Sequence, residues 1–139
     1  MSEKSFTLLE LIVVIIIIGI LGTLGFVQYN NALERSRAVE GISFLGSLRK
    51  AQTGYYLENG QYLFAQGANA LQPLGIDFGS FKYFDNSISC TNTNPTTDYC
   101  QVHRNLTIPT AYFLYINLSS GKISCNDVAG GQVCRTIGY

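Results

Sequence analysis

The sequence predicts an α+β protein, in which one long N-terminal helix packs against a small antiparallel β-sheet head that carries two disulfide loops. Two observations lead to this fold class. No proline occurs before Pro73, and apolar residues recur at helical spacing through the first 57 residues or so. The remainder is rich in tyrosine, phenylalanine, glycine and asparagine, with short strand-forming runs separated by turn residues.

The first half of the predicted helix is apolar on every side. From Leu11 to Val27 the chain has no charged side chain, which approaches the roughly 20 residues that cross a hydrocarbon core as a helix. Glu10 lies inside the apolar run rather than before it. An ionisable residue in a membrane segment is costly and is by default a functional hypothesis. We therefore expect an anchor segment whose carboxylate needs a partner.

The second half of the predicted helix is apolar on one side only. From Gln28 to Tyr56 apolar residues recur every three or four positions, as on one face of an amphipathic helix. We predict one helix from about Phe6 to about Leu57, ended by the turn signal Asn59-Gly60. The predicted apolar stripe consists of Tyr29, Ala32, Leu33, Val39, Ile42, Leu45, Leu48 and Tyr55.

The residues after the helix predict a loop and then a small antiparallel sheet. Residues 64–81 read as a loop anchored by apolar side chains, and residues 111–118 are rich in strand formers. Residues 119–122 form a turn that returns the chain as a hairpin at 123–125. Residues 82–84 and 101–107 are weaker strand candidates. The loop anchors are Leu71, Leu74, Ile76 and Phe78, and the strand face is Tyr112, Leu114, Ile116 and Leu118.

Four cysteines, an even number, predict disulfides formed in an oxidising compartment. Three pairings are possible, and we favour Cys90–Cys100 and Cys125–Cys134, because each pair brackets a short loop rich in turn residues, 92–98 and 125–139. Closing a loop of about 10 residues stabilises a fold by about 2–3 kcal/mol in the chain-entropy model. The spacings do not resemble a pair of CxxC units, so no metal site is expected.

The N-terminal residues Lys4-Ser5-Phe6-Thr7-Leu8-Leu9-Glu10-Leu11-Ile12 resemble the prepilin signature of the type IV pilin family. In that family a short charged leader is cut just before a phenylalanine, the new amino terminus is methylated, and a glutamate follows at the fifth mature position. The family usually has glycine before the cut, where this chain has Ser5. The run from Tyr55 to Tyr62 also resembles the segment that follows the long helix in many pilins and pseudopilins.

The resemblance implies a leader of residues 1–5, cleavage between Ser5 and Phe6, and N-methylation of Phe6. It implies that Glu10 directs assembly by pairing with the amine of Phe6. Residues 6–27 would be the transmembrane and filament-core half of the helix, and 28–139 the globular head with the amphipathic half. The partners implied are prepilin peptidase, the pilus assembly machinery, the inner membrane, and further copies of the chain in a helical surface filament.

Three glycines lie within the apolar half, at Gly19, Gly22 and Gly25. Glycine costs a helix interior about 1 kcal/mol relative to alanine. Many pilins carry a glycine near this point and a proline a little later, which this chain lacks. We expect the helix to stretch or melt locally here when it is packed in a filament. Small residues tolerated in an anchor are the alternative.

Other functions find less support in the residues. The formal net charge is zero, so no specific nucleic-acid binding is expected. His103 is the only histidine and the aspartates lack calcium-loop spacing, so we expect neither an enzyme nor a cofactor. The alternatives are a secretory signal cut near residues 23–25, a plain single-pass anchor, a minor pilin, a type II secretion pseudopilin, and a membrane-tethered adhesin or DNA-uptake receptor. Whether a filament would serve motility, adhesion, DNA uptake or secretion stays open.

Overall fold

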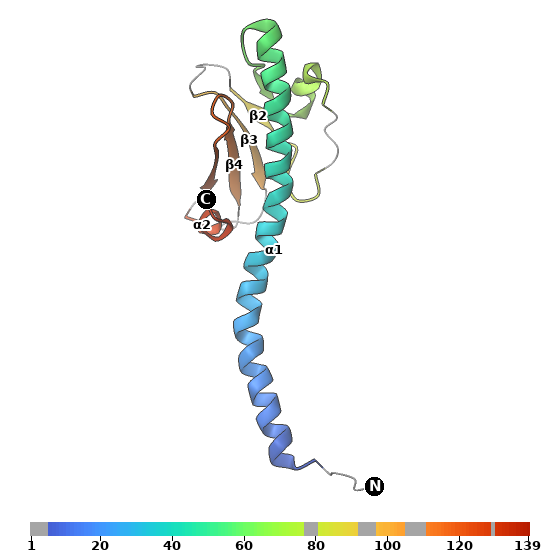
Figure 1. Ribbon diagram of the computed structural model, residues 1–139, viewed down its shortest axis with the longest axis vertical. Helices are drawn as coiled ribbons and strands as arrows, with labels where there is room; N and C mark the ends of the chain where they lie inside the picture. Colours follow the sequence, from blue (N-terminus) through green and yellow to red (C-terminus); the bar gives the residue numbers. More distant parts are fainter. Residues whose placement is uncertain (1–5, 77–80, 92–96, 105–110, 129) are drawn as a thin grey trace. The chain divides into compact units, whose positions relative to one another are not determined.

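The computed structural model describes residues 6–76, 81–91, 97–104, 111–128 and 130–139. The chain forms two compact units, residues 1–34 and residues 35–139; the second is called the head unit below. Figure 1 shows the elements in chain order. They are the helix α1 (Leu8–Asn59), the strand β1 (Ala65–Gln66), the 3-10 helix η1 (Ala68–Leu74), the strands β2 (Ser89–Cys90), β3 (Tyr99–Arg104), β4 (Tyr112–Asn117) and β5 (Ile123–Asp127), and the helix α2 (Val133–Ile137).

The long helix predicted for residues 6–57 is present as α1, whose 52 residues begin and end two positions later. Gly60 ends it with a positive φ of 75°, a conformation that glycine adopts without steric cost. The N–H of Gly60 donates to the carbonyl of Tyr56 at 2.8 Å, as expected for a left-handed residue after a helix. The helix is continuous through residues 19–25. Local stretching or melting of the helix around residues 19–25 was predicted for a packed filament, and it stays a prediction.

The buried face of α1 differs from the predicted apolar stripe. Leu45 and Leu48 are buried as expected, but Val39 is 59% exposed and Tyr29 is 61% exposed. The predicted stripe left out the small residues Ala38 and Gly41 and the polar residue Gln52, which belong to the buried face at the same three- and four-residue spacing. The buried residues of α1 are Ala38, Gly41, Leu45, Leu48 and Gln52.

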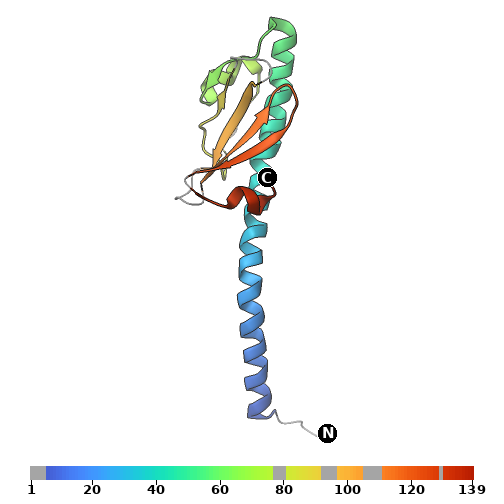
Figure 2. The ribbon, with the colours of Figure 1, turned by 90° about the vertical axis from the view of Figure 1, so that its left-hand side faces the viewer.

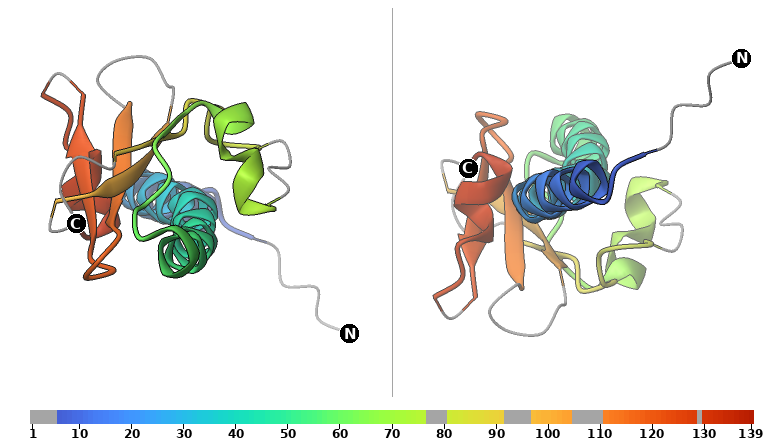
Figure 3. Two further views of the ribbon diagram at one scale, coloured as in Figure 1. Left: turned by 90° about the horizontal axis from the view of Figure 1, so that it is seen from above. Right: turned by 90° about the horizontal axis from the view of Figure 1, so that it is seen from below.

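The head unit contains a five-stranded sheet in which every strand pairs antiparallel with the next in sequence. Figures 2 and 3 show the strands as one layer beside the head part of α1. The predicted hairpin is confirmed, because Leu114 lies opposite Cys125 and Ile116 opposite Ile123. The predicted inward face of this strand is also confirmed: Tyr112, Leu114, Ile116 and Leu118 are all buried.

Residues 82–84 do not form the strand that the sequence suggested; they form a bend. The carboxylate of Glu40 accepts hydrogen bonds from the backbone N–H groups of Lys82 and Tyr83, both at 2.9 Å. These are the donors that a strand ladder would need. The side chain of the helix thus replaces a neighbouring strand.

Three other segments differ from the expectation in detail. The loop expected over 64–81 contains β1 and η1, and its predicted anchor Phe78 lies outside the described residues. The segment after Cys125 continues β5 and then forms α2. The weaker strand expected over 101–107 begins earlier, at Tyr99, and its residues 105–107 lie outside the described residues. Most of the expected polar loop 92–98 also lies outside them, and Asp98 is buried.

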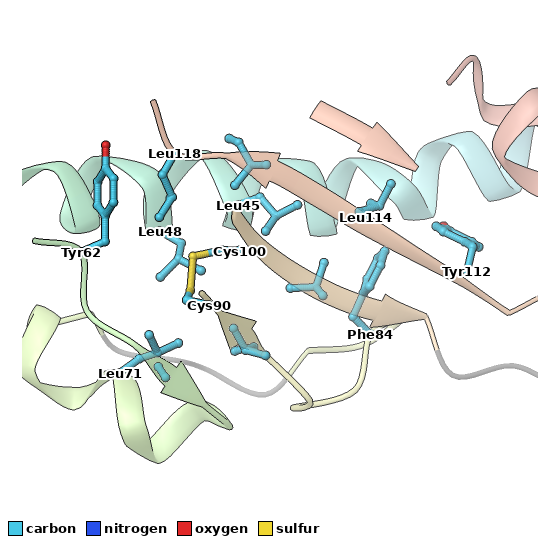
Figure 4. Packing of buried hydrophobic residues seen from close by; sticks show 14 of the residues in the cluster. Leu45, Leu48, Tyr62, Leu71, Phe84, Cys90, Cys100, Tyr112, Leu114 and Leu118 are labelled. Carbon is cyan, nitrogen blue, oxygen red and sulfur yellow. A yellow bond between two sulfur atoms is a disulfide. The ribbon is translucent and has the colours of Figure 1, made fainter. Parts of the chain in front are cut away.

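The two predicted disulfide loops are present. Cys90 on β2 and Cys100 on β3 lie directly opposite each other and are bonded, while Cys125 on β5 is bonded to Cys134 on α2. Figure 4 shows the first pair within the core, between the strands and the inward side chains of α1. The core cluster is Leu45, Leu48, Tyr62, Ala65, Leu71, Phe84, Ile88, Cys90, Cys100, Val102, Tyr112, Leu114, Ile116, Leu118 and Cys134.

Phe84 and Leu114 pack closely against the α1 backbone at Gly41. A Cβ there would lie 2.7 Å from Cζ of Phe84 and 3.0 Å from Cδ1 of Leu114, so Gly41→Ala is expected to destabilise the head by about 1–3 kcal/mol through overpacking. Gly46 is the matched control, since nothing lies within 4 Å of its Cβ position. Gly46→Ala should stabilise by up to about 1 kcal/mol. Thermal unfolding of the full chain in detergent compares the two variants. Equal changes in their unfolding midpoints would contradict the close packing of Phe84 and Leu114 on Gly41.

Candidate functional site: the N-terminal segment of α1

The segment that the sequence singled out begins with a capped helix end. The N–H of Glu10 donates to the side-chain oxygen of Thr7 at 3.2 Å, and the N–H of Leu11 donates to the Thr7 carbonyl at 3.3 Å. Thr7-Leu8-Leu9-Glu10 therefore has the order of a capping box, in which a threonine before the helix binds the third helical N–H group. The sequence analysis assigned Thr7 no structural role, although the order Thr-x-x-Glu is a recognisable signal for the start of a helix.

The backbone N–H of Glu10 is used in the helix cap, but its side-chain carboxylate is not. Its residue is exposed, and the structure records no ion pair between Glu10 and any residue that it describes. Its backbone N–H serves the cap, so the helix end accounts for the main chain of Glu10 and leaves the function of its side chain to be explained. Ser5 and the rest of residues 1–5 lie outside the described residues, while Phe6 is 77% exposed.

Every residue from Phe6 to Asn30 is exposed, including all the large apolar side chains of this segment. Their exposed fractions run from 43% at Ile12 to 77% at Phe6. Soluble monomers rarely expose contiguous apolar surface beyond a few hundred Å². Fully burying one such aliphatic side chain gains about 1.5–3 kcal/mol. This surface therefore needs a cover of lipid or protein.

By length and composition α1 can cross a membrane. Its most apolar window of 18 residues has a mean hydropathy of 2.7, and none of that window is buried within the structure. The core helix of a soluble protein passes the same test of hydropathy, but such a helix is mostly buried. Exposure of the whole apolar segment thus distinguishes this helix from a core helix.

The amphipathic half of α1 holds the head unit through polar side chains that the sequence reasoning did not single out. The amide of Gln52 binds the backbone of Leu63 twice, accepting from its N–H at 2.8 Å and donating to its carbonyl at 2.9 Å. Arg49 donates to the carbonyls of Leu118 at 2.9 Å and Ser119 at 3.0 Å. Local sequence gives no signal for these bonds, because their partners lie far along the chain.

The one histidine has an acidic partner that sequence spacing did not suggest. Nδ1 of His103 lies 2.7 Å from a carboxylate oxygen of Asp85, and the His103 ring stacks on Phe113 with centroids 4.3 Å apart. The backbone N–H of Asp85 also donates to the carbonyl of His103 at 3.0 Å. These contacts fasten the residues before β2 to β3. Among the described residues no group of three or more potential metal ligands occurs.

One comparison with known proteins bears on this segment. Residues 1–26 match the family model of the prokaryotic N-terminal methylation motif, which is the type IV prepilin signature. The match covers residues 1–5, Phe6, Glu10 and most of the apolar run, and it does not extend into the head unit. No protein in the curated collection matches the chain.

The segment therefore defines a class: a protein whose exposed apolar helix is long enough to cross a membrane and begins with the type IV prepilin signature. Within that class the motif supports a type IV pilin-like or pseudopilin protein. The signature implies processing by prepilin peptidase and the assembly machinery, and it suits anchoring in the inner membrane before assembly.

Proposed function

We propose that this protein is a structural subunit of a type IV pilus and not an enzyme. The precursor is held in the inner membrane by residues 6–27, with residues 1–5 on the cytoplasmic side. Prepilin peptidase cuts between Ser5 and Phe6, and the new amino group is methylated. The chain then polymerises into a helical surface filament, with residues 28–139 outside the filament core. The observation that carries the proposal is the exposed apolar helix that begins at the matched signature.

Glu10 sets the axial register in this proposal. Cleavage creates an α-amino group at Phe6 that the precursor lacks, and methylation keeps it titratable while adding apolar area. The amine of the same chain, or of a neighbour already in the filament, then neutralises the Glu10 carboxylate. Desolvation offsets much of the attraction between buried charges, whereas an unpaired buried charge is strongly unfavourable. The pair therefore selects one offset between helices, and the apolar contacts supply most of the cohesion.

A minor pilin or a type II secretion pseudopilin carries the same signature, so the signature alone leaves these relatives as the second candidate. The Cys125–Cys134 bond favours a pilin, since pseudopilins often lack a C-terminal cysteine pair. Abundance separates them, because a major pilin is the main component of filaments sheared from the cell surface.

The mature N-terminus tests the processing step. Intact-mass and N-terminal peptide analysis of the protein from sheared filaments should find Phe6 first, carrying one added methyl group, and no peptide that contains residues 1–5. The leader should remain when the peptidase is absent, which serves as the control. Filaments that retain Met1 to Ser5 would overturn the assignment of the cleavage site.

A further inference from the structure

The outward face of the five-stranded sheet has no Asp, Glu, Lys or Arg side chain among the described strand residues. Strand residues alternate between the two faces of a sheet, and the alternate set here faces the core beneath the head part of α1 (Figure 3). A soluble surface commonly carries about a quarter to a third charged side chains, so this face is unusual. Its residues are Gln66, Ser89, Tyr99, Gln101, His103, Phe113, Tyr115, Asn117, Ser124 and Asn126.

Four aromatic rings on β3 and β4 form an unbroken row of contacts across this face. The ring centroid of Tyr115 lies 5.5 Å from that of Tyr99 and 6.1 Å from that of Phe113. The Phe113 ring in turn stacks on His103 with centroids 4.3 Å apart. All four residues are partly exposed. Because each ring is held by its neighbours, little side-chain freedom remains to be lost when a ligand binds.

Amide and hydroxyl groups flank these rings on the same face. Residues directly opposite each other on neighbouring strands share a face, with Cβ atoms about 4.5–5.5 Å apart. Gln101 lies opposite Tyr115 on one side, and Ser124 lies opposite Tyr115 on the other. The same row continues from Gln101 to Ser89 and Gln66. An amide both donates and accepts hydrogen bonds, as a hydroxyl does, so neutral polar groups border the central ring on both sides.

The lack of charge selects among the ligands that stack on aromatic rings. The bases of single-stranded nucleic acid stack on such rows, but proteins that bind them also line the site with cations that follow the phosphates. The described outward strand positions supply no Lys or Arg. Nδ1 of His103 lies 2.7 Å from the Asp85 carboxylate, so any charge on that ring is balanced. The face therefore suits an uncharged ligand.

The face also lacks what a protein partner needs. Protein interfaces have an apolar core surrounded by a polar rim. The outward strand positions in the described residues hold no aliphatic side chain, and Phe113 is their one ring without a polar atom. A sugar has the opposite combination, with C–H groups that pack on aromatic rings and hydroxyls that bond amides. Rings alternating with neutral hydrogen-bonding groups therefore match a carbohydrate.

We propose that the outward face of β3, β4 and β5 binds a neutral oligosaccharide. Tyr99 and Tyr115 pack against sugar rings, while the amide of Gln101 and the hydroxyl of Ser124 bond sugar hydroxyls. From Tyr99 to His103 the strand advances about 13 Å, which suits several linked sugars rather than one. The site lies wholly within the head unit, so neither the anchor nor cleavage before Phe6 enters into it.

The test measures sugar binding by the full chain in phosphatidylcholine nanodiscs, because detergents with sugar headgroups would compete. The probes are chitotetraose, cellotetraose and lacto-N-neotetraose, and empty discs are the blank. Saturation-transfer NMR should detect at least one of them, with a Kd of about 1 mM, since a few hydrogen bonds and ring contacts must offset the cost of association. Binding should be insensitive to salt, because neither partner is charged.

Two variants of the site and two matched controls locate the binding. Tyr115→Ala should weaken it about tenfold, and Gln101→Ala about three- to tenfold. Tyr56→Ala on α1 and Gln61→Ala after α1 remove exposed residues of the same types away from this face, and should leave the affinity unchanged. Near-ultraviolet circular dichroism checks that each variant is folded. If Tyr115→Ala does not fold, Gln101→Ala decides the result.

Every contrary result points elsewhere. Failure of all three sugars to bind, or an equal loss with the control variants, would overturn the carbohydrate site. Tighter binding of oligodeoxythymidylate that salt removes would assign the face to nucleic acid instead. Self-association of the chain that Tyr115→Ala abolishes, with no sugar bound, would assign it to a second copy. None of these results bears on cleavage before Phe6 or on assembly through Glu10, which are measured separately.

Discussion

Glu10→Leu is expected to reduce filament assembly strongly while the protein still inserts and its head unit still folds. The substitution removes the proposed partner of the Phe6 amine, which then enters the apolar filament core unpaired. Because an uncompensated buried charge is strongly unfavourable and each 1.4 kcal/mol is about tenfold in an equilibrium constant, pilus yield should fall roughly a hundredfold. Electron microscopy and immunoblotting of sheared filaments, set against the membrane-bound pool, measure the effect.

Two variants separate the charge of Glu10 from its place in the helix end. Glu10→Gln keeps the size and the hydrogen-bonding shape but loses the charge, so it should fail to assemble as well. Thr7→Ala removes the side chain that caps the Glu10 N–H and costs about 1 kcal/mol of helix stability, yet it should assemble nearly normally. Pili from the Gln variant at the level of the parent protein would refute the role of the ion pair in register.

Gln52→Leu is expected to destabilise the head unit more than any other single substitution of similar volume in α1. Gln52 is fully buried, and its amide satisfies both the N–H and the carbonyl of Leu63. Leucine leaves both groups without these partners, at about 1–3 kcal/mol each, so a loss of roughly 2–6 kcal/mol is expected. Thermal unfolding of the full chain in detergent should show it as a lower midpoint for loss of the near-ultraviolet circular dichroism signal.

The matched control is Gln61→Leu, since Gln61 is exposed and should change stability by no more than about 0.5 kcal/mol. Gln52→Glu adds a second comparison. An ionised glutamate accepts from the Leu63 N–H but opposes the Leu63 carbonyl, whereas a protonated one can donate to it. The deficit of this variant should therefore shrink as the pH falls. A deficit that does not depend on pH would contradict the two-bond geometry.

The sequence predicted the parts of this fold that depend on local pattern. The length of α1 followed from the absence of proline and from helical spacing, and the β4–β5 hairpin followed from two-residue alternation around a turn at residues 119–122. The N-terminal signature followed from a fixed order of residues, which the family match at residues 1–26 confirms as the prepilin signature. Each of these signals lies within a few residues of the structure that it specifies.

The parts that were missed depend on partners far along the chain. Nothing near Gly41 indicates that Phe84 packs on it, and nothing near residues 82–84 indicates that Glu40 takes their N–H groups. The predicted stripe contained Val39 because apolar spacing alone cannot tell which side of a helix the sheet will cover. The pairing of His103 with Asp85 was not predicted either, because the two residues are 18 positions apart in the sequence.

The buried bond between Cys90 and Cys100 has a consequence for the order of events in the life of the chain. Both residues are wholly removed from solvent, so an oxidant must reach the two sulfur atoms before the core closes around them. Once the core has closed, a reductant gains access only when β2 and β3 open together. For the proposed pilus subunit, this bond must therefore form in an oxidising compartment, while the head unit folds and before the chain enters a filament.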